Sequence, residues 1–392
     1  MNDAEWVSKA RELAKGFAAG AALHDREGSF PFENFEELRR AGFPGLTVER
    51  RFGGAEVSLT TFLRVQEALA TGDGSTALAV NMHFIRFGPE RESPTYPEHW
   101  LAQMSRGAVE HGWLANTAAT EEGLGSPAGG GTPETAAVAV EGGWVLDGRK
   151  TFTTMAPLLH YFIVMARAPG EAGQPGIANF VVYRDDPGVS VEETWDSLGM
   201  RATASHDLVL EGVRLPAERL LNRRVAGGPE ARGAGGLVWF ALGVSAVTIG
   251  VAQAARDYAV AFARERTPKD NRTIKEYPGV RQRLARIDLL LQRSRALVYD
   301  AAAAWEAKTA DGMAPLHRAA VAKVDTLNNC IEALDLAMRV VGGVSLQKRR
   351  PIERYYRDVR AALHNPPLED RALEMLARAA LDEPLELPKA VE

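Results

Sequence analysis

The sequence predicts an α+β protein of three domains, because the pattern of apolar residues changes twice along its 392 residues. Helical spacing prevails up to about His111, strand-like alternation from about Gly112 to Leu221, and long helical patterns after about Val225. We therefore expect an N-terminal α-helical domain over residues 1–111 and a middle antiparallel β-barrel domain over residues 112–222. A C-terminal four-helix bundle is expected over residues 223–392.

The first domain is predicted to be helical from the spacing of its apolar residues. Phe32, Phe35 and Leu38 recur at helical intervals, and Gly42 is a suitable stop. A second apolar helix is expected over residues 59–69, followed by a break and a further helical run from Ala77.

The middle segment is predicted to form strands. Residues 136–152 predict a hairpin with Gly142-Gly143 at its turn, and Asp147-Gly148 predicts a second turn. Because no helical pattern separates the strands, an antiparallel sheet or barrel is favoured over a doubly wound fold. Further strands are expected at 161–168, 177–184, 189–195 and 206–216.

The last domain is predicted from stripes of apolar residues at intervals of three and four. Residues 237–255 carry no charge and are long enough to span a membrane. They contain Gln253 and continue into an amphipathic segment, so we expect the central helix of a soluble bundle instead. Two more long helices contain the stripes Leu284, Ile287, Leu291 and Val298, and Val321, Val324, Leu327, Ile331, Leu334, Met338 and Val341.

Composition excludes several classes of function. The net charge of −5, from 46 basic and 51 acidic residues, gives no electrostatic reason to expect nucleic acid as a partner. Cys330 is the single cysteine, so an intrachain disulfide and a Cys-based zinc site are excluded. Residues 1–16 are charged throughout and lack the apolar core of a signal peptide, and a reducing, cytoplasmic setting is expected.

Several segments, in order, resemble the acyl-CoA dehydrogenase superfamily. Residues 119–127 (ATEEGLGSP) resemble its Thr-Glu-Pro…Gly-Ser-Asp loop, and residues 146–154 (LDGRKTFTT) resemble its hairpin. Residues 198–216 resemble a strand signature, and residues 250–266 and 340–358 resemble two bundle segments. The resemblance implies a flavin-dependent oxidoreductase with FAD, or alternatively FMN or reduced flavin. It also implies a homodimer or homotetramer that works with an electron-transfer partner or a flavin reductase.

The resemblance assigns contacts with the flavin ring to the middle domain. Thr120 and Thr154 match family threonines at the ring, Thr153 lies beside them, and Phe152 matches an aromatic residue next to the ring. Hydroxyl and backbone N–H groups suit the polar edge of an isoalloxazine. Without the resemblance, Phe152 would be expected as a core strand residue and the threonines as β-formers.

Other matches concern the phosphates of the cofactor. Ser126 matches a serine near the phosphate groups, although Glu122 and Pro127 depart from the family loop, and a plain surface loop is the alternative. Arg266 matches an arginine that reaches across a dimer interface to the FAD pyrophosphate, which suits a planar guanidinium. Gly342-Gly343 matches paired glycines where backbone approaches FAD from another subunit, and a helix C-cap is the alternative.

The usual catalytic base of the family is missing. Dehydrogenation needs a carboxylate over the α-carbon of the substrate. The two positions that hold this carboxylate in the family align with Pro366 and Phe240, and neither side chain ionises. Glu369 and Asp370 lie nearby in sequence and are expected to be solvated. Arg357 and Asp358, which precede this segment, are expected to form ion pairs or caps.

His364 offers different chemistry. Residues 363–367 (LHNPP) resemble the LHDP segment of reduced-flavin monooxygenases built on the same fold, in which the histidine acts beside the flavin. An imidazole can pass a proton in either direction near neutral pH. The alternative is a helix-terminal histidine, because Pro366 disfavours helix at Asn365.

Three functions stay open at this point. One is dehydrogenation of an acyl thioester or a related small organic substrate with a displaced base. Another is oxygenation by reduced flavin and O₂ through His364. The third is a non-catalytic protein that binds flavin or an acyl ligand.

Overall fold

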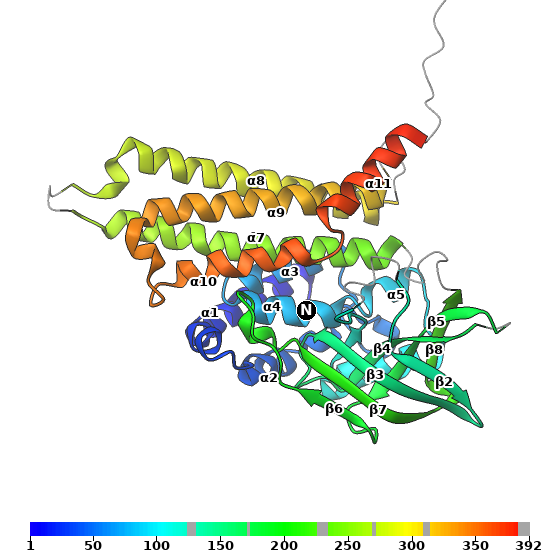
Figure 1. Cartoon of the computed structure of the whole chain (residues 1–392). Coiled ribbons are helices and arrows are strands. Elements are labelled where there is room, and N and C mark those ends of the chain that lie inside the picture. Colours follow the sequence, from blue (N-terminus) through cyan, green and yellow to red (C-terminus); the bar gives the residue numbers. More distant parts are fainter. Residues whose placement is uncertain (124–130, 171–172, 226–233, 269–271, 309–313, 383–392) are drawn as a thin grey trace, which may run out of the picture.

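The computed structural model describes residues 1–392 except 124–130, 171–172, 226–233, 269–271, 309–313 and 383–392. Its described part contains N-terminal helices, a sheet and a set of long C-terminal helices (Figure 1). The change from helices to strands falls between His111 and Ala115, close to the predicted boundary. The N-terminal helices are α1 (Asp3–Glu27), α2 (Phe32–Arg40), α3 (Leu59–Ala70), α4 (Gly74–Phe84), α5 (Gly88–Glu92) and α6 (Glu98–Arg106).

Local sequence signals set the ends of these helices. Asn2 and Glu5 form a reciprocal capping box at the start of α1. The side chain of Asp73 accepts from the backbone N–H groups of Ser75 and Thr76 and caps α4. As predicted, the helix with Phe32, Phe35 and Leu38 ends just before Gly42, which has φ +78°.

The middle domain is a mixed sheet rather than the predicted antiparallel one. Its strands follow the order β6-β7-β3-β2-β4-β5-β8, with β1 paired to β4. Pairings β1–β4 and β2–β4 are parallel, and the other strand pairs are antiparallel. The described pairings do not close into a barrel. The strands are β1 (Ala115–Ala118), β2 (Ala136–Val140), β3 (Gly143–Thr153), β4 (Tyr161–Pro169), β5 (Pro175–Tyr183), β6 (Val189–Glu192), β7 (His206–Pro216) and β8 (Leu220–Val225).

Of the two predicted turns, one is displaced by one residue and the other is wrong. The β2–β3 hairpin is confirmed, but because Val140 pairs with Gly143, its turn is Glu141-Gly142, one residue earlier than predicted. Asp147-Gly148 instead lies inside β3, at a shift in the β3–β7 register. Gly148 has φ +152°, and a Cβ there would lie 2.5 Å from the Thr135 hydroxyl. The glycine therefore serves a bulge and a close backbone approach.

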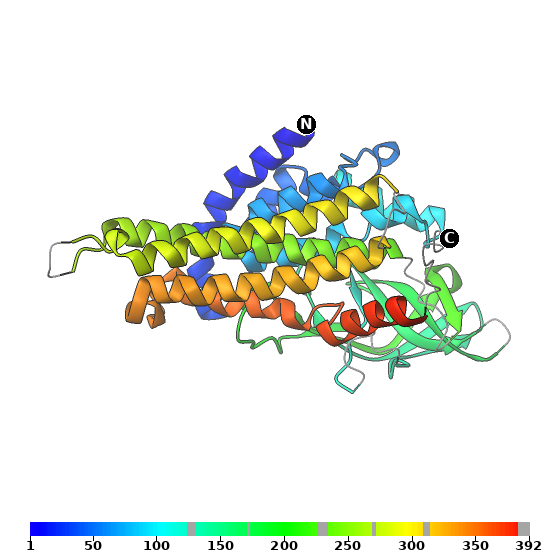
Figure 2. The same ribbon diagram turned by 90° about the horizontal axis from the view of Figure 1, so that it is seen from above.

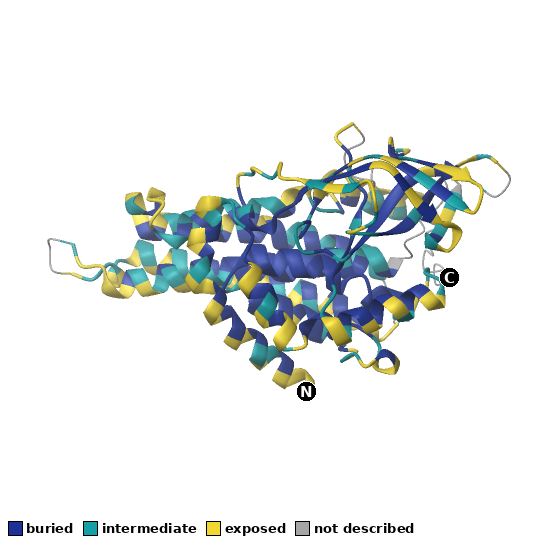
Figure 3. Ribbon diagram, turned by 90° about the horizontal axis from the view of Figure 1, so that it is seen from below, coloured by how far each residue is buried: buried dark blue, intermediate teal, exposed yellow. Residues whose placement is uncertain are grey.

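The C-terminal helices pack beside one another as predicted (Figure 2). Within the described residues, α7 is the helix long and apolar enough to cross a membrane, and 83% of its most apolar window is buried inside the protein. Figure 3 shows buried residues concentrated where the long helices meet the N-terminal ones. The helices are α7 (Ala234–Glu265), α8 (Pro278–Glu306), α9 (Pro315–Val341), α10 (Pro351–Asp358), the 3₁₀ helix η9 (Val359–His364) and α11 (Glu369–Asp382).

A polar junction ties all three parts together. Arg357 on α10 donates to both carboxylate oxygens of Asp25 on α1, at 2.9 and 2.6 Å. The buried Asp358 accepts from the backbone N–H of Met200 at 2.7 Å, and burial raises the pKa of this carboxyl to about 7. A Cβ at Gly199 would lie 2.5 Å from the Arg357 carbonyl oxygen, so glycine permits this close approach. Arg357 and Asp358 thus have the structural roles predicted for them.

Candidate functional site

The end of β3 presents an exposed aromatic ring on a strained backbone. Phe152 is 61% exposed and has φ +54°, at a second shift in the β3–β7 register. Its ring meets that of Trp195 edge-on at 5.4 Å. A bulky residue at positive φ is a genuine outlier, and such strain clusters at functional sites. The alternative of a core strand residue is therefore wrong for Phe152.

The neighbouring threonines differ in their surroundings. Thr153 is fully buried, and its hydroxyl has no hydrogen-bond partner among the described residues. Thr154 is partly exposed, and its hydroxyl lies 2.9 Å from that of Ser205. Thr120 is also partly exposed, and its carbonyl accepts from the Thr151 backbone N–H at 2.9 Å. The structure thus brings the loop of Thr120 against β3 next to Phe152.

A buried ion pair anchors the loop that carries Thr120. Glu121 accepts from Lys150 Nζ at 2.5 Å and from the backbone N–H groups of Glu134 and Thr135. Burial would raise the pKa of Glu121, but these hydrogen bonds outweigh it and hold that pKa below its usual value. Burial lowers the pKa of Lys150. The pair is deeply buried, so it is a structural element rather than a reactive one.

We expect Glu121→Gln to lower the free energy of unfolding by about 3 kcal/mol, because the buried ammonium of Lys150 loses its counter-charge. Lys150→Met should cost less, since Glu121 keeps its two backbone donors. The double variant should cost less than the sum of the single ones. Urea unfolding of the three variants measures these values. Additive losses would contradict a coupled pair.

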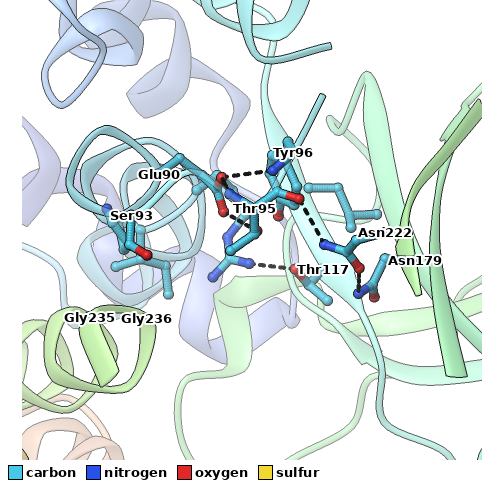
Figure 4. Close-up of a pocket in the computed structure, with 13 residues that line it drawn as sticks. Glu90, Ser93, Thr95, Tyr96, Thr117, Asn179, Asn222, Gly235 and Gly236 are labelled. Carbon is cyan, nitrogen blue, oxygen red and sulfur yellow. Dashed lines mark hydrogen bonds between the residues drawn. The ribbon is translucent and has the colours of Figure 1, made fainter. Parts of the chain in front are cut away.

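A small polar cavity lies where α4–α5, the sheet and the start of α7 meet (Figure 4). It holds about 50 Å³, the space of a few water molecules. Arg86 lines it and donates to the Thr117 hydroxyl at 2.6 Å. Asn179 donates to the Asn222 side chain at 2.7 Å on the opposite wall, and Glu90 holds Thr95 through two hydrogen bonds of 2.6 Å.

The cavity reaches α7, the helix that carries Phe240, one of the two predicted base positions. Gly235 and Gly236 at the start of α7 form part of its wall. Gly236 and Phe240 are four residues apart and so lie on one face of α7. Phe240 is partly exposed although most of this helix is buried. The cavity therefore lies about one helical turn from Phe240.

Comparisons with known proteins identify the family. Models of the acyl-CoA dehydrogenase N-terminal, middle and C-terminal domains match residues 3–107, 116–213 and 210–363. YdbM of Bacillus subtilis, provisionally named an acyl-CoA dehydrogenase, is 41% identical over 96% of this chain and 97% of its own. The chain belongs to the acyl-CoA dehydrogenase superfamily. Members of this superfamily are flavin-dependent oxidoreductases.

Other relatives show how varied the superfamily is. L-Evernosamine nitrososynthase of a Micromonospora species is 32% identical over 88% of this chain and 82% of its own. The structure of KijD3 with FMN and an amino-sugar nucleotide has a TM-score of 0.85 at 29% identity and covers 98% of this chain and 95% of that one. Butyryl-CoA dehydrogenase of Megasphaera elsdenii, 23% identical over 97% of this chain and 99% of that one, shares the fold with a TM-score of 0.85.

The remaining residues predicted from the superfamily lie apart from the sheet. Gly342 and Gly343 are exposed at the end of α9, and Gly342, at φ +75°, is also the helix C-cap. Arg266 is exposed just beyond α7. No hydrogen bond within the described part of the chain joins these residues to Thr154. Ser126 lies outside the described residues.

His364 ends the 3₁₀ helix η9, and Asn365 is extended, as the following proline predicts. The imidazole is exposed and has no hydrogen-bond partner among the described residues. Pro366 lies two residues after this exposed imidazole, and neither Pro366 nor Phe240, the two predicted base positions, can ionise. Glu369 is exposed at the start of α11, as expected.

Two groups of site residues were not predicted from the sequence. The cavity residues Arg86, Asn179 and Asn222 lie in segments without a recognisable motif. Thr203 and Ser205, which contact the hydroxyl of Thr154 directly or through one another, lie inside the segment 198–216. Their small hydroxyl side chains, spaced by two within that segment, were the available signal.

Proposed function

We propose that the chain is an oxygenating flavoenzyme that uses reduced flavin and O₂ on a small polar substrate. The observation that carries this proposal is that Pro366 and Phe240, at the two predicted base positions, cannot ionise, whereas His364 is exposed. A dehydrogenase needs a carboxylate that removes an α-proton. An oxygenating enzyme has no such requirement, and an imidazole can supply or take the protons it moves.

The residues of the site fit a flavin. Phe152 offers an exposed ring on a strained backbone, Thr154 follows it in sequence, and the loop of Thr120 is hydrogen-bonded to β3 at Thr151; both threonines are partly exposed. Bound flavin would supply the redox chemistry of the reaction. We propose that Thr120, Phe152 and Thr154 hold the ring, with Arg266 and Gly342-Gly343 toward the phosphates of FAD.

The polar cavity supports a polar substrate. It holds about 50 Å³, enough for a small substituent but not for an acyl chain, and an apolar group there would remove water from the guanidinium of Arg86 without replacing its hydrogen bonds. A hydroxyl, amine or carboxylate group would find partners on both walls. Two relatives agree with a polar substrate: L-evernosamine nitrososynthase by its name, and KijD3 by the amino-sugar nucleotide in its structure.

Flavin binding is the first test. We expect the purified protein to bind FAD or reduced FAD at micromolar concentration, and FMN more weakly, because FMN lacks the second phosphate and the nucleotide that would lie toward Arg266. Titration calorimetry with oxidised FAD under air and with dithionite-reduced FAD under nitrogen measures both redox states. Sedimentation should show a dimer or a tetramer, since Arg266 and Gly342 are expected to reach one cofactor from two chains. No binding of either flavin in either state would end the proposal.

A second candidate function is oxidoreduction of an acyl thioester. The anchored loop of Glu121 and Lys150 favours it, because both residues belong to segments that match the dehydrogenase pattern. The provisional name of the relative YdbM, an acyl-CoA dehydrogenase, agrees with this candidate. An electron-transfer partner would then replace the flavin reductase expected for the first candidate.

A further inference from the structure

Three side-chain hydroxyls form a chain behind the end of β3. Thr154 Oγ1 lies 2.9 Å from Ser205 Oγ, and Ser205 Oγ lies 2.8 Å from Thr203 Oγ1. Thr203 Oγ1 in turn lies 3.0 Å from the carbonyl oxygen of Met200. Thr203 and Ser205 are 1% and 5% exposed, so water does not compete for these hydrogen bonds.

The direction of each hydrogen bond follows from counting protons. A carbonyl oxygen only accepts, so Thr203 donates its one hydroxyl proton to the Met200 carbonyl. Thr203 must then accept from Ser205, and this hydrogen bond uses the one hydroxyl proton of Ser205. Ser205 must in turn accept from Thr154. The proton of Thr154 therefore points inward, away from the partly exposed side of the residue.

The inner end of the chain is held firmly. The Met200 carbonyl also accepts from the indole N–H of Trp195 at 3.1 Å. The backbone N–H of Met200 is bound by Asp358 at 2.7 Å, and the Thr203 carbonyl accepts from the Met155 N–H at 3.0 Å. Turning the three hydroxyl protons the other way would lose the buried hydrogen bond from Thr203 to the Met200 carbonyl. This hydrogen bond favours Thr154 as a hydrogen-bond acceptor toward the site.

We propose that this hydroxyl chain makes the site select the reduced state of flavin. The inference rests on the proposed function, which places the flavin ring at Thr154. The N5 atom of oxidised isoalloxazine is an acceptor, and in the reduced ring N5 carries a hydrogen. An acceptor-only hydroxyl binds the reduced N5–H and leaves the oxidised N5 facing another lone pair. Ser205 and Thr203 are then positioning residues that set the redox preference through Thr154.

The test compares affinities for the two redox states. The protein, freed of flavin, is titrated under nitrogen with oxidised and with dithionite-reduced FAD, following tryptophan fluorescence. We expect wild type to bind reduced FAD about tenfold more tightly, the worth of one hydrogen bond that is otherwise unsatisfied. The reduction potential of bound FAD should then lie about 30 mV above that of free FAD.

Variants of the chain separate direction from simple structure. Ser205→Ala frees the Thr154 proton to turn toward N5, so the ratio of affinities should fall toward one. Ser205→Thr keeps a hydroxyl and should keep the ratio. Ser197→Ala is the matched control, because Ser197 lies in the same segment but donates only to the Gly199 carbonyl. If Ser205→Ala does not fold, Thr203→Val breaks the chain one step further in and should have the same effect.

The outcomes distinguish the two proposals. Equal binding of both redox states by wild type, or a ratio that Ser205→Ala and Thr203→Val leave unchanged, would overturn the hydroxyl chain as the selector while flavin binding stands. Absence of binding in both states would overturn the proposed function and this inference with it. Tenfold selectivity that disappears in Ser205→Ala but persists in Ser205→Thr and Ser197→Ala is the expected result.

Discussion

Straight-chain acyl-CoAs should reduce the bound flavin about 10²–10⁴-fold more slowly than they reduce a superfamily member that keeps its carboxylate, because loss of a general base costs this much. Pro366 and Phe240 lie at the two positions where a base is predicted, and Glu369 is exposed at the start of α11. Anaerobic stopped-flow mixing with a chain-length series measures the rate of flavin bleaching.

Restoring the carboxylate tests the reason for this slowness. Phe240→Glu places a carboxylate on the face of α7 shared with Gly236, and Phe240→Gln is the matched control of the same size without charge. Bleaching should rise in the glutamate variant alone. Rapid bleaching of wild type by any acyl-CoA would contradict the prediction, and Glu369→Gln would then show whether Glu369 is the base.

The architecture was predictable where the chain repeats a simple pattern. The stripe from Val321 to Val341 predicts α9 because one face of a helix must be apolar to pack against α7 and α8. Strand direction was not predictable in the same way. Strands β1 and β2 run parallel to β4. Between β2 and β4 the chain returns through strand β3 and not through a helix, so no helical pattern marks the parallel pairing.

The site was predictable only where a motif carries it. Phe152 and Thr154 follow from the segment 146–154, whereas their exposure depends on a bulge that forms against β7. Arg86 and Asn222 meet at one cavity from segments more than a hundred residues apart, which no local pattern records. The acceptor role of Thr154 depends on three successive hydroxyl contacts and so requires coordinates.

His364→Ala should leave folding and flavin affinity nearly intact and should reduce turnover by about 10²–10⁴-fold if oxygenation is the reaction. A helix-terminal histidine at an exposed site contributes at most about 1 kcal/mol to stability. The imidazole has no hydrogen-bond partner among the described residues, so no described hydrogen bond is lost with it. The thermal midpoint, the rate at which O₂ reoxidises the reduced holoprotein and the yield of oxygenated product are measured together.

His111→Ala is the matched control, because His111 is also exposed at the last residue of a helical segment, Gly107–His111, and lies in no proposed site. We expect His111→Ala to leave reoxidation and product yield at wild-type values, with a similarly small change in thermal midpoint. A structural role for His364 predicts the opposite pairing, in which stability falls and chemistry is unchanged. If His364→Ala reoxidises and yields product as wild type does, the imidazole has no part in the reaction. Oxidoreduction of an acyl thioester would then become the leading function, because the exposed imidazole would no longer favour oxygenation.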